Sequence, residues 1–272
     1  MTGRDNGLYA GLDVGSLFTK AAVVQNGQLV GWAVTETGES SRAAAEASLH
    51  VALAPVGATR GDIGGAVVTG AGMREVDPAL EARQATGVLA VARGAAHLAP
   101  GSAGALDLGG ESTHVVKLDS NGQVLEFARN DKCAAGTGIF LDAMADLMRI
   151  PVPQMGARSL EAEGTVDVSS TCVVFAESEV VSAIHRQTPK EDILHGIHHS
   201  IATRVHGLVN RLGLEAPVLA VGGLALNVGI VKCLEDLAGH PITVPEEPRI
   251  AGALGAALLA AEGKGSLPGG AP

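Results

Sequence analysis

One pattern of strands and turns occurs twice in this chain, and it limits the possible folds more than any other feature. In the first copy, an apolar strand at 8–14 ends in an acidic glycine turn, and two strands follow at 19–25 and 28–35 around an Asn-Gly hairpin signal. The second copy runs from Gly104 to Arg129. The alignment places Asp13 on Asp107, Gly15 on Gly109 and Thr19 on Thr113. Since the acidic residue, the glycine and the hairpin recur in order, the sequence predicts an internal duplication.

The remaining periodicity predicts an α/β protein with two lobes. Expected further strands are at 65–69, 166–169, 217–221 and 242–244, and expected helices are at 40–53, 80–98, 139–148, 171–184, 190–212, 227–237 and 251–261. The last helix is so rich in glycine and alanine that it should lie against another backbone. Lobe I is expected at 8–103 with the return helix 251–263, lobe II at 104–250, and flexible tails at 1–7 and 264–272.

Composition excludes several classes of function. The chain has 272 residues and a net charge of −10, which disfavours a nucleic-acid partner because phosphate binding needs a basic face. No run reaches the roughly 18 apolar residues of a membrane span, and no apolar leader is expected to direct secretion. The sequence therefore predicts a cytoplasmic protein. Its 3 cysteines suggest thiols or a metal site rather than a disulfide framework.

The two acidic turns have the chemistry of a site for a metal-bound phosphate. Carboxylates such as Asp13 and Asp107 suit Mg²⁺, and glycines allow backbone N–H groups to approach phosphate oxygens. The residues expected to add such N–H groups, hydroxyls or positive charge are Gly15, Ser16, Thr19, Lys20, Gly109 and Gly110. A third turn, Gly222-Gly223, precedes a helix and could let a nucleoside lie close. Each turn taken alone is also compatible with an ordinary strand ending.

Two cysteines precede predicted helices. Cys133 lies before the small-residue turn that ends at Gly138, and Cys172 follows Ser169-Ser-Thr. The unpaired N–H groups of a helix start favour thiolate, the form that binds metal. Cys233 falls in an apolar helical pattern and is expected to be a buried structural thiol.

Other polar residues near these helices have a plain and a functional interpretation. His195, His198 and His199 are predicted to form a solvated helix face rather than a metal site. Glu177 and Glu179 are expected to compensate the helix dipole after Cys172, with tuning of a site as the alternative.

The order of the three glycine turns resembles the actin, hexokinase and sugar-kinase superfamily of ATP-binding proteins. The resemblance implies a duplicated, ribonuclease-H-like, two-lobed ATPase fold, with a first phosphate loop at 13–20, a second at 107–111 and an adenosine loop at Gly222-Gly223, with Asn227 also binding the nucleotide. The cysteine motifs, Asn130-Asp-Lys-Cys-Ala-Ala-Gly-Thr-Gly138 and Ser170-Thr-Cys172, resemble one branch. That branch comprises the activators of 2-hydroxyacyl-CoA dehydratases and the ATPase subunits of benzoyl-CoA reductases.

This resemblance implies ATP-driven electron transfer. A homodimer, or a dimer with a sister subunit, would hold one oxygen-sensitive [4Fe-4S] cluster between Cys133 and Cys172 of each chain. Counting agrees, since such a cluster commonly takes four thiolates. ATP hydrolysis to ADP, with Mg²⁺ and with Asp13, Asp107 and Glu111 as catalytic residues, would drive an electron from ferredoxin or flavodoxin to a dehydratase or reductase partner.

One position departs from the resemblance, and two alternative functions remain open. Glu111 stands where the family is expected to have a glutamine, and a carboxylate can take a proton from water whereas an amide can only orient it. A small-molecule kinase of the same fold is one alternative, although no insertion offers a dedicated substrate pocket. A non-redox ATP-dependent scaffold is the other, and it would not require Cys133 or Cys172.

Overall fold

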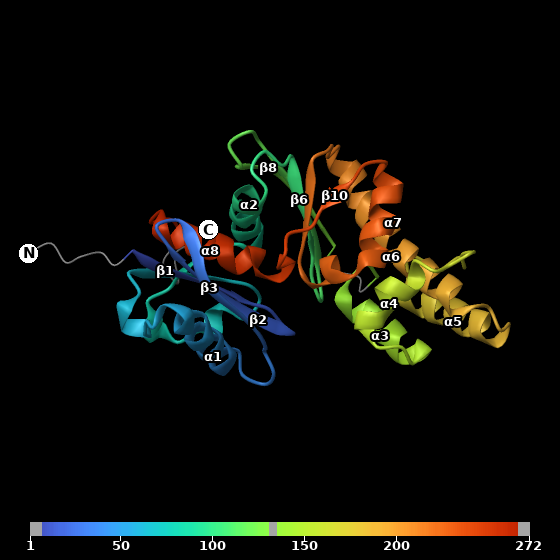
Figure 1. Cartoon of the computed structure of the whole chain (residues 1–272), viewed down its shortest axis with the longest axis horizontal. Coiled ribbons are helices and arrows are strands. Elements are labelled where there is room, and N and C mark those ends of the chain that lie inside the picture. The colour runs from blue at the N-terminus through green and yellow to red at the C-terminus, as the bar shows by residue number, and fades with distance from the viewer. Residues whose placement is uncertain (1–6, 131–134, 266–272) are drawn as a thin grey trace, which may run out of the picture. The chain divides into compact units, whose positions relative to one another are not determined.

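A computed structural model describes residues 7–130 and 135–265 of the chain. These residues form two compact units (Figure 1). The first comprises the chain up to Gly101, the turn Asp119–Val124 and the segment from Arg249 onward, and the second comprises Ser102–Leu118 and Leu125–Pro248. The tails expected at 1–7 and 264–272 lie almost entirely outside the described residues.

The described part of the first unit is built on a five-stranded sheet in the order β3-β2-β1-β4-β5. Its strands are β1 (Leu8–Val14), β2 (Phe18–Gln25), β3 (Gln28–Glu36), β4 (Gly65–Thr69) and β5 (Arg83–Gln84). Its helices are α1 (Ser41–Leu53), α2 (Gly87–Leu98) and α8 (Ala251–Ala261). Alternation along the strands gives the sheet two apolar faces: Ala21 and Val23 pack with α1, whereas Ala22 and Val24 pack with α8.

Helix α8 lies with its backbone against α2 and β1, as its composition predicted. A Cβ atom on Gly255 would be 1.8 Å from the carbonyl oxygen of Ala90, and one on Gly94 would be 2.0 Å from that of Ala251. On the sheet side, a Cβ on Gly11 would be 2.0 Å from the carbonyl oxygen of Ala253. Only glycine fits at these positions, so small residues set the distance between these elements.

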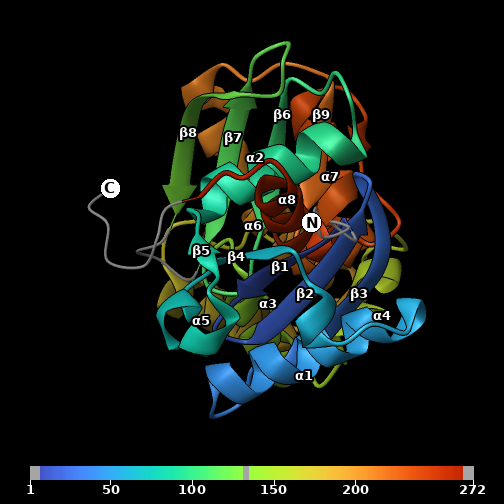
Figure 2. The same ribbon diagram turned by 90° about the vertical axis from the view of Figure 1, so that its left-hand side faces the viewer.

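The described part of the second unit repeats this strand pattern in a sheet of order β10-β9-β6-β7-β8, which Figure 2 shows edge to edge from β8 to β9. Its strands are β6 (Gly104–Leu108), β7 (Thr113–Leu118), β8 (Val124–Asn130), β9 (Val218–Val221) and β10 (Ile242–Thr243). Its helices are α3 (Gly138–Met148), α4 (Val152–Ser159), α5 (Val173–His185), α6 (Lys190–Leu212) and α7 (Val228–Ala238). The long helix α6 supplies the largest set of buried residues in its core.

The strand registers confirm the predicted duplication. Asp13 pairs with Lys20 across β1 and β2, and Asp107 pairs with His114 across β6 and β7. The turns match as well, because Gly15 N–H donates to the Phe18 carbonyl at 3.1 Å and Gly109 N–H donates to the Ser112 carbonyl at 3.0 Å.

Two predictions of secondary structure were wrong. The helix expected at 80–98 begins only at Gly87, because residues 83–84 pair with β4 as a short strand and Thr86 caps the helix. The segment 166–169 is not a strand; it runs along α6, where Gly196 leaves room for the Val166 carbonyl and Ser200 bonds to the Ser169 carbonyl. Helix α4 was not predicted, since proline and glycine interrupt its sequence.

Among the described residues, no helix combines the length and apolar character needed to cross a membrane.

The close packing of α8 gives a prediction about stability. Gly255→Ala should lower the free energy of unfolding by roughly 1–3 kcal/mol, because the new methyl group would overlap the Ala90 carbonyl. Gly87→Ala at the start of α2 is the matched control: its Cβ would meet only Thr69 Oγ1 at 3.9 Å, so stability should stay within about 1 kcal/mol. Thermal and urea unfolding would measure both, and equal stability of the two variants would contradict this account.

Candidate functional site

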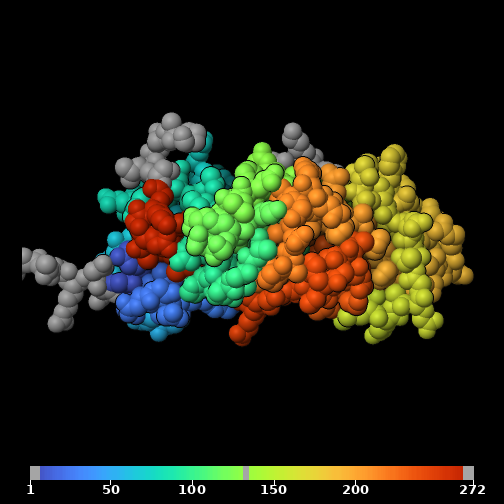
Figure 3. All heavy atoms as spheres, turned by 90° about the horizontal axis from the view of Figure 1, so that it is seen from above, coloured from blue at the N-terminus to red at the C-terminus, as the bar shows by residue number. Residues whose placement is uncertain are grey.

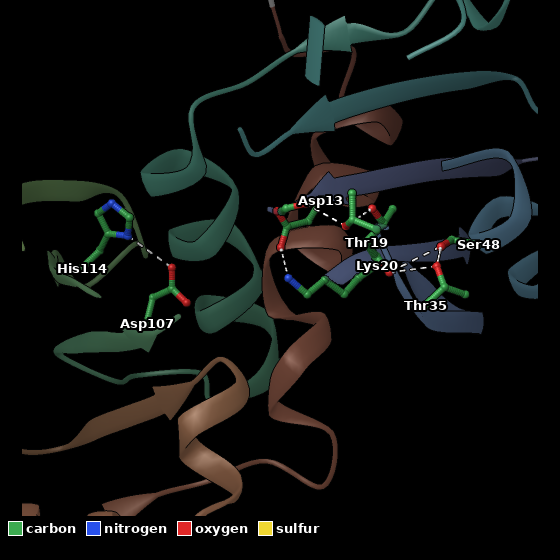
Figure 4. Close-up of polar contacts among 9 residues, drawn as sticks. Asp13, Thr19, Lys20, Thr35, Ser48, Asp107 and His114 are labelled. Atoms are coloured by element: carbon green, nitrogen blue, oxygen red, sulfur yellow. Dashed lines mark hydrogen bonds and ion pairs between the residues drawn. The ribbon is translucent and has the colours of Figure 1, made fainter. Parts of the chain in front are cut away.

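The carboxylate of Asp13 lies at the end of β1 and remains partly open. Lys20 Nζ is 3.2 Å from Asp13 Oδ2, with the two side chains 19% and 22% exposed (Figure 4). Two glycines leave space for the Asp13 carboxylate. A Cβ at Gly70 would be 2.8 Å from Asp13 Oδ1, and one at Gly252 would be 3.2 Å from Asp13 Oδ2. Gly252 belongs to the first turn of α8, whose dipole favours a negative charge there. Gly70 was not predicted as a residue of this site.

The hydroxyl groups of the first loop divide into one exposed and one buried. Ser16 is exposed. Thr19 is fully buried, and its hydroxyl lies 2.9 Å from that of Thr37, which donates to the Gly15 carbonyl at 2.8 Å. Thr19 was expected to offer its hydroxyl to a ligand, but the structure uses it to support the loop from the core side.

The second loop repeats the first with one change of residue. His114 Nδ1 lies 3.4 Å from Asp107 Oδ2, and His114 follows Asp107 by the same seven positions that separate Lys20 from Asp13. Figure 4 shows both pairs. The carboxylate of Glu111 is exposed, and no described residue bonds to it. His114 was not predicted as a site residue, although the duplication aligned it with Lys20.

The second loop is bonded directly to the segment that follows Cys133. Gly138 N–H donates to the Gly109 carbonyl at 3.1 Å, and Ile139 N–H donates to the Gly110 carbonyl at 2.9 Å. Thr113 Oγ1 donates to the Gly136 carbonyl at 2.8 Å. Cys133 itself lies outside the described residues. Two N–H groups at the start of α3 are therefore already paired, which corrects the expectation that they would face a thiolate.

The third loop lies at the same edge of the sheet as the second. Val221 aligns with Asp107 between the parallel strands β9 and β6. Gly222 has φ +88°, and a Cβ there would be 2.5 Å from the Leu108 carbonyl oxygen, so only glycine allows this approach. The structure thus brings together Asp107, Gly109, Gly110, Gly222 and Gly223 within one unit.

Asn227 is buried and both atoms of its amide are engaged. Its Oδ1 accepts from the N–H groups of Gly229 at 3.0 Å and Ile230 at 3.1 Å, which caps α7. Its Nδ2 lies 3.2 Å from His198 Nε2. Asn227 is predicted to bind the nucleotide, and its side chain caps the helix that follows the third loop.

His198 is fully buried, so the prediction of a solvated histidine face was wrong for this residue. Its Nδ1 lies 2.8 Å from Ser159 Oγ, which donates to the Gly156 carbonyl at 2.8 Å. The consistent assignment is a neutral ring that donates from Nδ1 and accepts from Asn227 at Nε2. Burial, with a smaller contribution from His195, lowers the pKa of His198 from 6.5 to about 4. The sequence pattern does not reveal the burial of His198, because three of every seven positions of a long helix can face the core.

Cys172 and Cys233 lie in opposite environments. Cys172 is a half-buried free thiol at the N-cap of α5, and its N–H lies 3.4 Å from Ser169 Oγ. Glu179 Oε2 accepts from Ser169 N–H at 2.6 Å, so Glu179 holds the loop before Cys172 rather than only offsetting a dipole. Cys233 is buried in the core, and burial raises its pKa to about 11, in agreement with a structural thiol.

Within the described residues, no group of three or more His, Cys, Asp or Glu side chains could hold a metal ion.

The two repeated units and their glycine loops define a class of protein, the ATPases with the actin and sugar-kinase type of fold. A ROK-family glucokinase from Streptomyces griseus shares this fold with a TM-score of 0.58 at 14% identity, over 94% of this chain and 100% of that chain. Residues 10–260 match the model of the BadF/BadG/BcrA/BcrD ATPase family. The chain belongs to this family and is an ATPase.

Among its relatives, the 2-hydroxyisocaproyl-CoA dehydratase activator of Clostridioides difficile is 40% identical over 250 residues, which is 92% of this chain and 93% of that protein. A solved structure of such an activator from Clostridium difficile, with bound ADPNP, superposes with a TM-score of 0.88 at 40% identity over 94% of this chain and 95% of that one. Component A of the (R)-2-hydroxyglutaryl-CoA dehydratase of Acidaminococcus fermentans superposes with a TM-score of 0.90 at 35% identity over 94% of this chain and 98% of that one.

The His114–Asp107 pair gives a prediction about ATP hydrolysis. His114→Leu leaves the Asp107 carboxylate without its partner and should lower kcat/KM for ATP by roughly tenfold, comparable to the loss of one charged hydrogen bond. His114→Lys copies the first loop and should stay within a few-fold of the wild type. Steady-state ATPase assays would measure both, and full activity of the leucine variant would show that the pair is dispensable.

The buried His198 gives a prediction about stability and pH. Its folded-state pKa of about 4 lies below the ordinary 6.5, so the unfolded chain binds the proton first as the pH falls. His198 should therefore cost no stability above pH 6.5 and should lower the free energy of unfolding by roughly 3 kcal/mol between pH 6.5 and pH 4. His198→Gln should lose this part of the pH dependence in urea unfolding. Its neighbour His199→Gln, an exposed control, should retain it.

Proposed function

We propose that this chain is the ATPase component of an electron-transfer system for a 2-hydroxyacyl-CoA dehydratase or a benzoyl-CoA reductase type of enzyme. It would take one electron from a ferredoxin or flavodoxin and deliver it to the dehydratase or reductase partner in the cytoplasm, with ATP hydrolysis as the driving reaction. The names of its relatives support the kind of partner.

The observation that carries this proposal is the bonding between the second glycine loop and the start of α3. The carbonyls of Gly109 and Gly110 accept from Gly138 and Ile139, only five and six residues after Cys133. A change at the phosphates of ATP would therefore reach the Cys133 segment through two hydrogen bonds. A kinase or scaffold has no need for such a link between a nucleotide loop and a cysteine.

For the nucleotide, each acidic loop would offer one carboxylate suited to Mg²⁺, Asp13 beside Lys20 in the first loop and Asp107 beside His114 in the second. The N–H groups of Gly110 and Gly223, and the side-chain-free backbone at Gly15 and Gly222, would lie against phosphates and nucleoside. The exposed carboxylate of Glu111 on the second loop would act on the attacking water, accepting its proton as well as orienting it.

The residues present fit a [4Fe-4S] cluster shared between two chains. Cys172 is accessible and free, while Cys233 is buried, so one chain offers Cys172 and Cys133 as thiolates. Four thiolates then require two chains. When bound, the cluster supplies one-electron chemistry at low potential, and its exposure at an interface would make it oxygen-sensitive.

A homodimer is supported by apolar side chains beside Cys172. Val174 and Phe175 are 65% and 64% exposed on α5, directly after the cysteine. Val181 and Ile184 of the same helix are also exposed. Apolar residues of this size seldom remain in water on a single helix, and contact with a second copy would cover them.

Iron analysis tests the proposal. Anaerobically purified protein should contain about two irons and two acid-labile sulfides per chain and have the solution mass of a dimer, because one four-iron cluster is divided between two chains. Cys172→Ser should lose the iron but keep nucleotide binding, and the matched control Cys233→Ser should keep both.

Absence of iron and sulfide, even after anaerobic reconstitution, would refute the electron-transfer proposal. The protein would then be tested as a kinase, by screening phosphoryl acceptors, or as a scaffold.

A further inference from the structure

Helix α6 carries two buried polar side chains that bond to different segments of the second unit. His198 is 0% exposed and Ser200 is 2% exposed. Residues two positions apart lie on nearly opposite faces of a helix. One face of α6 therefore contacts Asn227, which follows the third loop, and the other contacts the segment before Cys172.

On the first face, His198 joins α6 to α4 and α7. Its ring lies between Ser159 Oγ at 2.8 Å and Asn227 Nδ2 at 3.2 Å, and Asn227 caps α7 directly after the third loop. The fit is tight, because a Cβ at Gly229 would be 2.5 Å from His198 Nδ1 and 2.1 Å from Ser159 Oγ. Helices α6 and α7 pack against each other, and Figure 3 shows this part of the chain in shades of orange.

On the opposite face, Ser200 joins α6 to the loop that leads to Cys172. Ser200 Oγ donates to the Ser169 carbonyl at 2.9 Å. One turn earlier, a Cβ at Gly196 would be 2.2 Å from the Val166 carbonyl oxygen, so the segment 166–169 lies directly on the helix backbone. Ser169 Oγ in turn accepts from the N–H groups of Thr171 and Cys172.

We propose that α6 couples the nucleotide loop to the cysteine loop, with His198 and Ser200 as the two positioning residues. The proposal rests on the proposed function for the identity of the ligands at the two ends. A ligand that orders Gly222 to Asn227 would shift or stiffen α6 through His198, and Ser200 would pass that change to the Cys172 loop. This path is separate from the bonds of Gly109 and Gly110, which reach the Cys133 segment.

The alternative is that both side chains only satisfy buried polar groups. In that case each would contribute to stability, but removing one would leave the response of Cys172 to nucleotide intact. Coupling between sites is a free energy, commonly a 5- to 150-fold effect of one ligand on the other site, so it can be measured as a ratio of rates.

The test follows the alkylation of Cys172 by iodoacetamide in the full-length chain after anaerobic removal of iron, with peptide mass spectrometry to resolve each cysteine. Saturating MgATP analogue should change the Cys172 rate in the wild type by roughly fivefold or more. In Ser200→Ala, this change should fall below about twofold. His198→Gln should show the same loss together with weaker nucleotide binding, and Cys233 serves as an internal monitor of unfolding because it is buried.

The matched control is Lys117→Met, which removes two bonds to the C-terminal carbonyls of the same helix, at Leu212 and Gly213, far along α6 from His198. It should keep the full nucleotide effect on Cys172. A wild type without any nucleotide effect, or a Ser200→Ala variant with the full effect, would overturn the coupling.

This readout does not need a bound cluster. If the purified protein holds no iron even after anaerobic reconstitution, but Cys172 shows a Ser200-dependent response to nucleotide, the proposed function is refuted and the coupling stands. If the purified protein holds iron, but nucleotide does not change the alkylation rate of Cys172 in the iron-free form, the coupling is refuted and the proposed function stands.

Discussion

The hydrogen bonds from the start of α3 to the carbonyls of Gly109 and Gly110 are the contact on which the organisation of the second unit depends. They bring two stretches of backbone close together, since a Cβ at Gly138 would be 3.0 Å from Gly110 Cα. The same glycines leave the backbone open to a phosphate. One short loop therefore serves both as a candidate ligand site and as the support for the segment after Cys133.

The buried polar groups around α6 extend this organisation to the other cysteine. A neutral histidine inside an apolar core is costly unless both ring nitrogens are bonded, and His198 meets this condition through Ser159 and Asn227. Fully bonded networks of this kind specify one arrangement of the helices that share them. The arrangement of α4, α6 and α7 is thus determined by polar contacts as well as by the surrounding apolar residues.

The two acidic loops are alike in geometry and differ in their side chains. Lys20 and His114 occupy equivalent registers beside Asp13 and Asp107. Glu111 adds a second carboxylate to the second loop. The duplication preserved the backbone and allowed the side chains to diverge.

Local pattern was sufficient for most of the elements and for the candidate loops. The repeat of Asp, Gly and Asn-Gly predicted both three-stranded units, and the composition of α8 predicted its close packing, because period and side-chain size act within a few residues of sequence.

The positions that the sequence pattern could not assign are those whose partners lie far along the chain. His198 and Asn227 are 29 residues apart, Ser200 and Ser169 are 31 apart, and Thr19 meets Thr37 across the sheet. Whether such a side chain faces a ligand, the solvent or another side chain depends on which helix packs against it. Burial is a property of the assembled core, so only the folded chain could show that His198 is internal and that Asn227 caps α7.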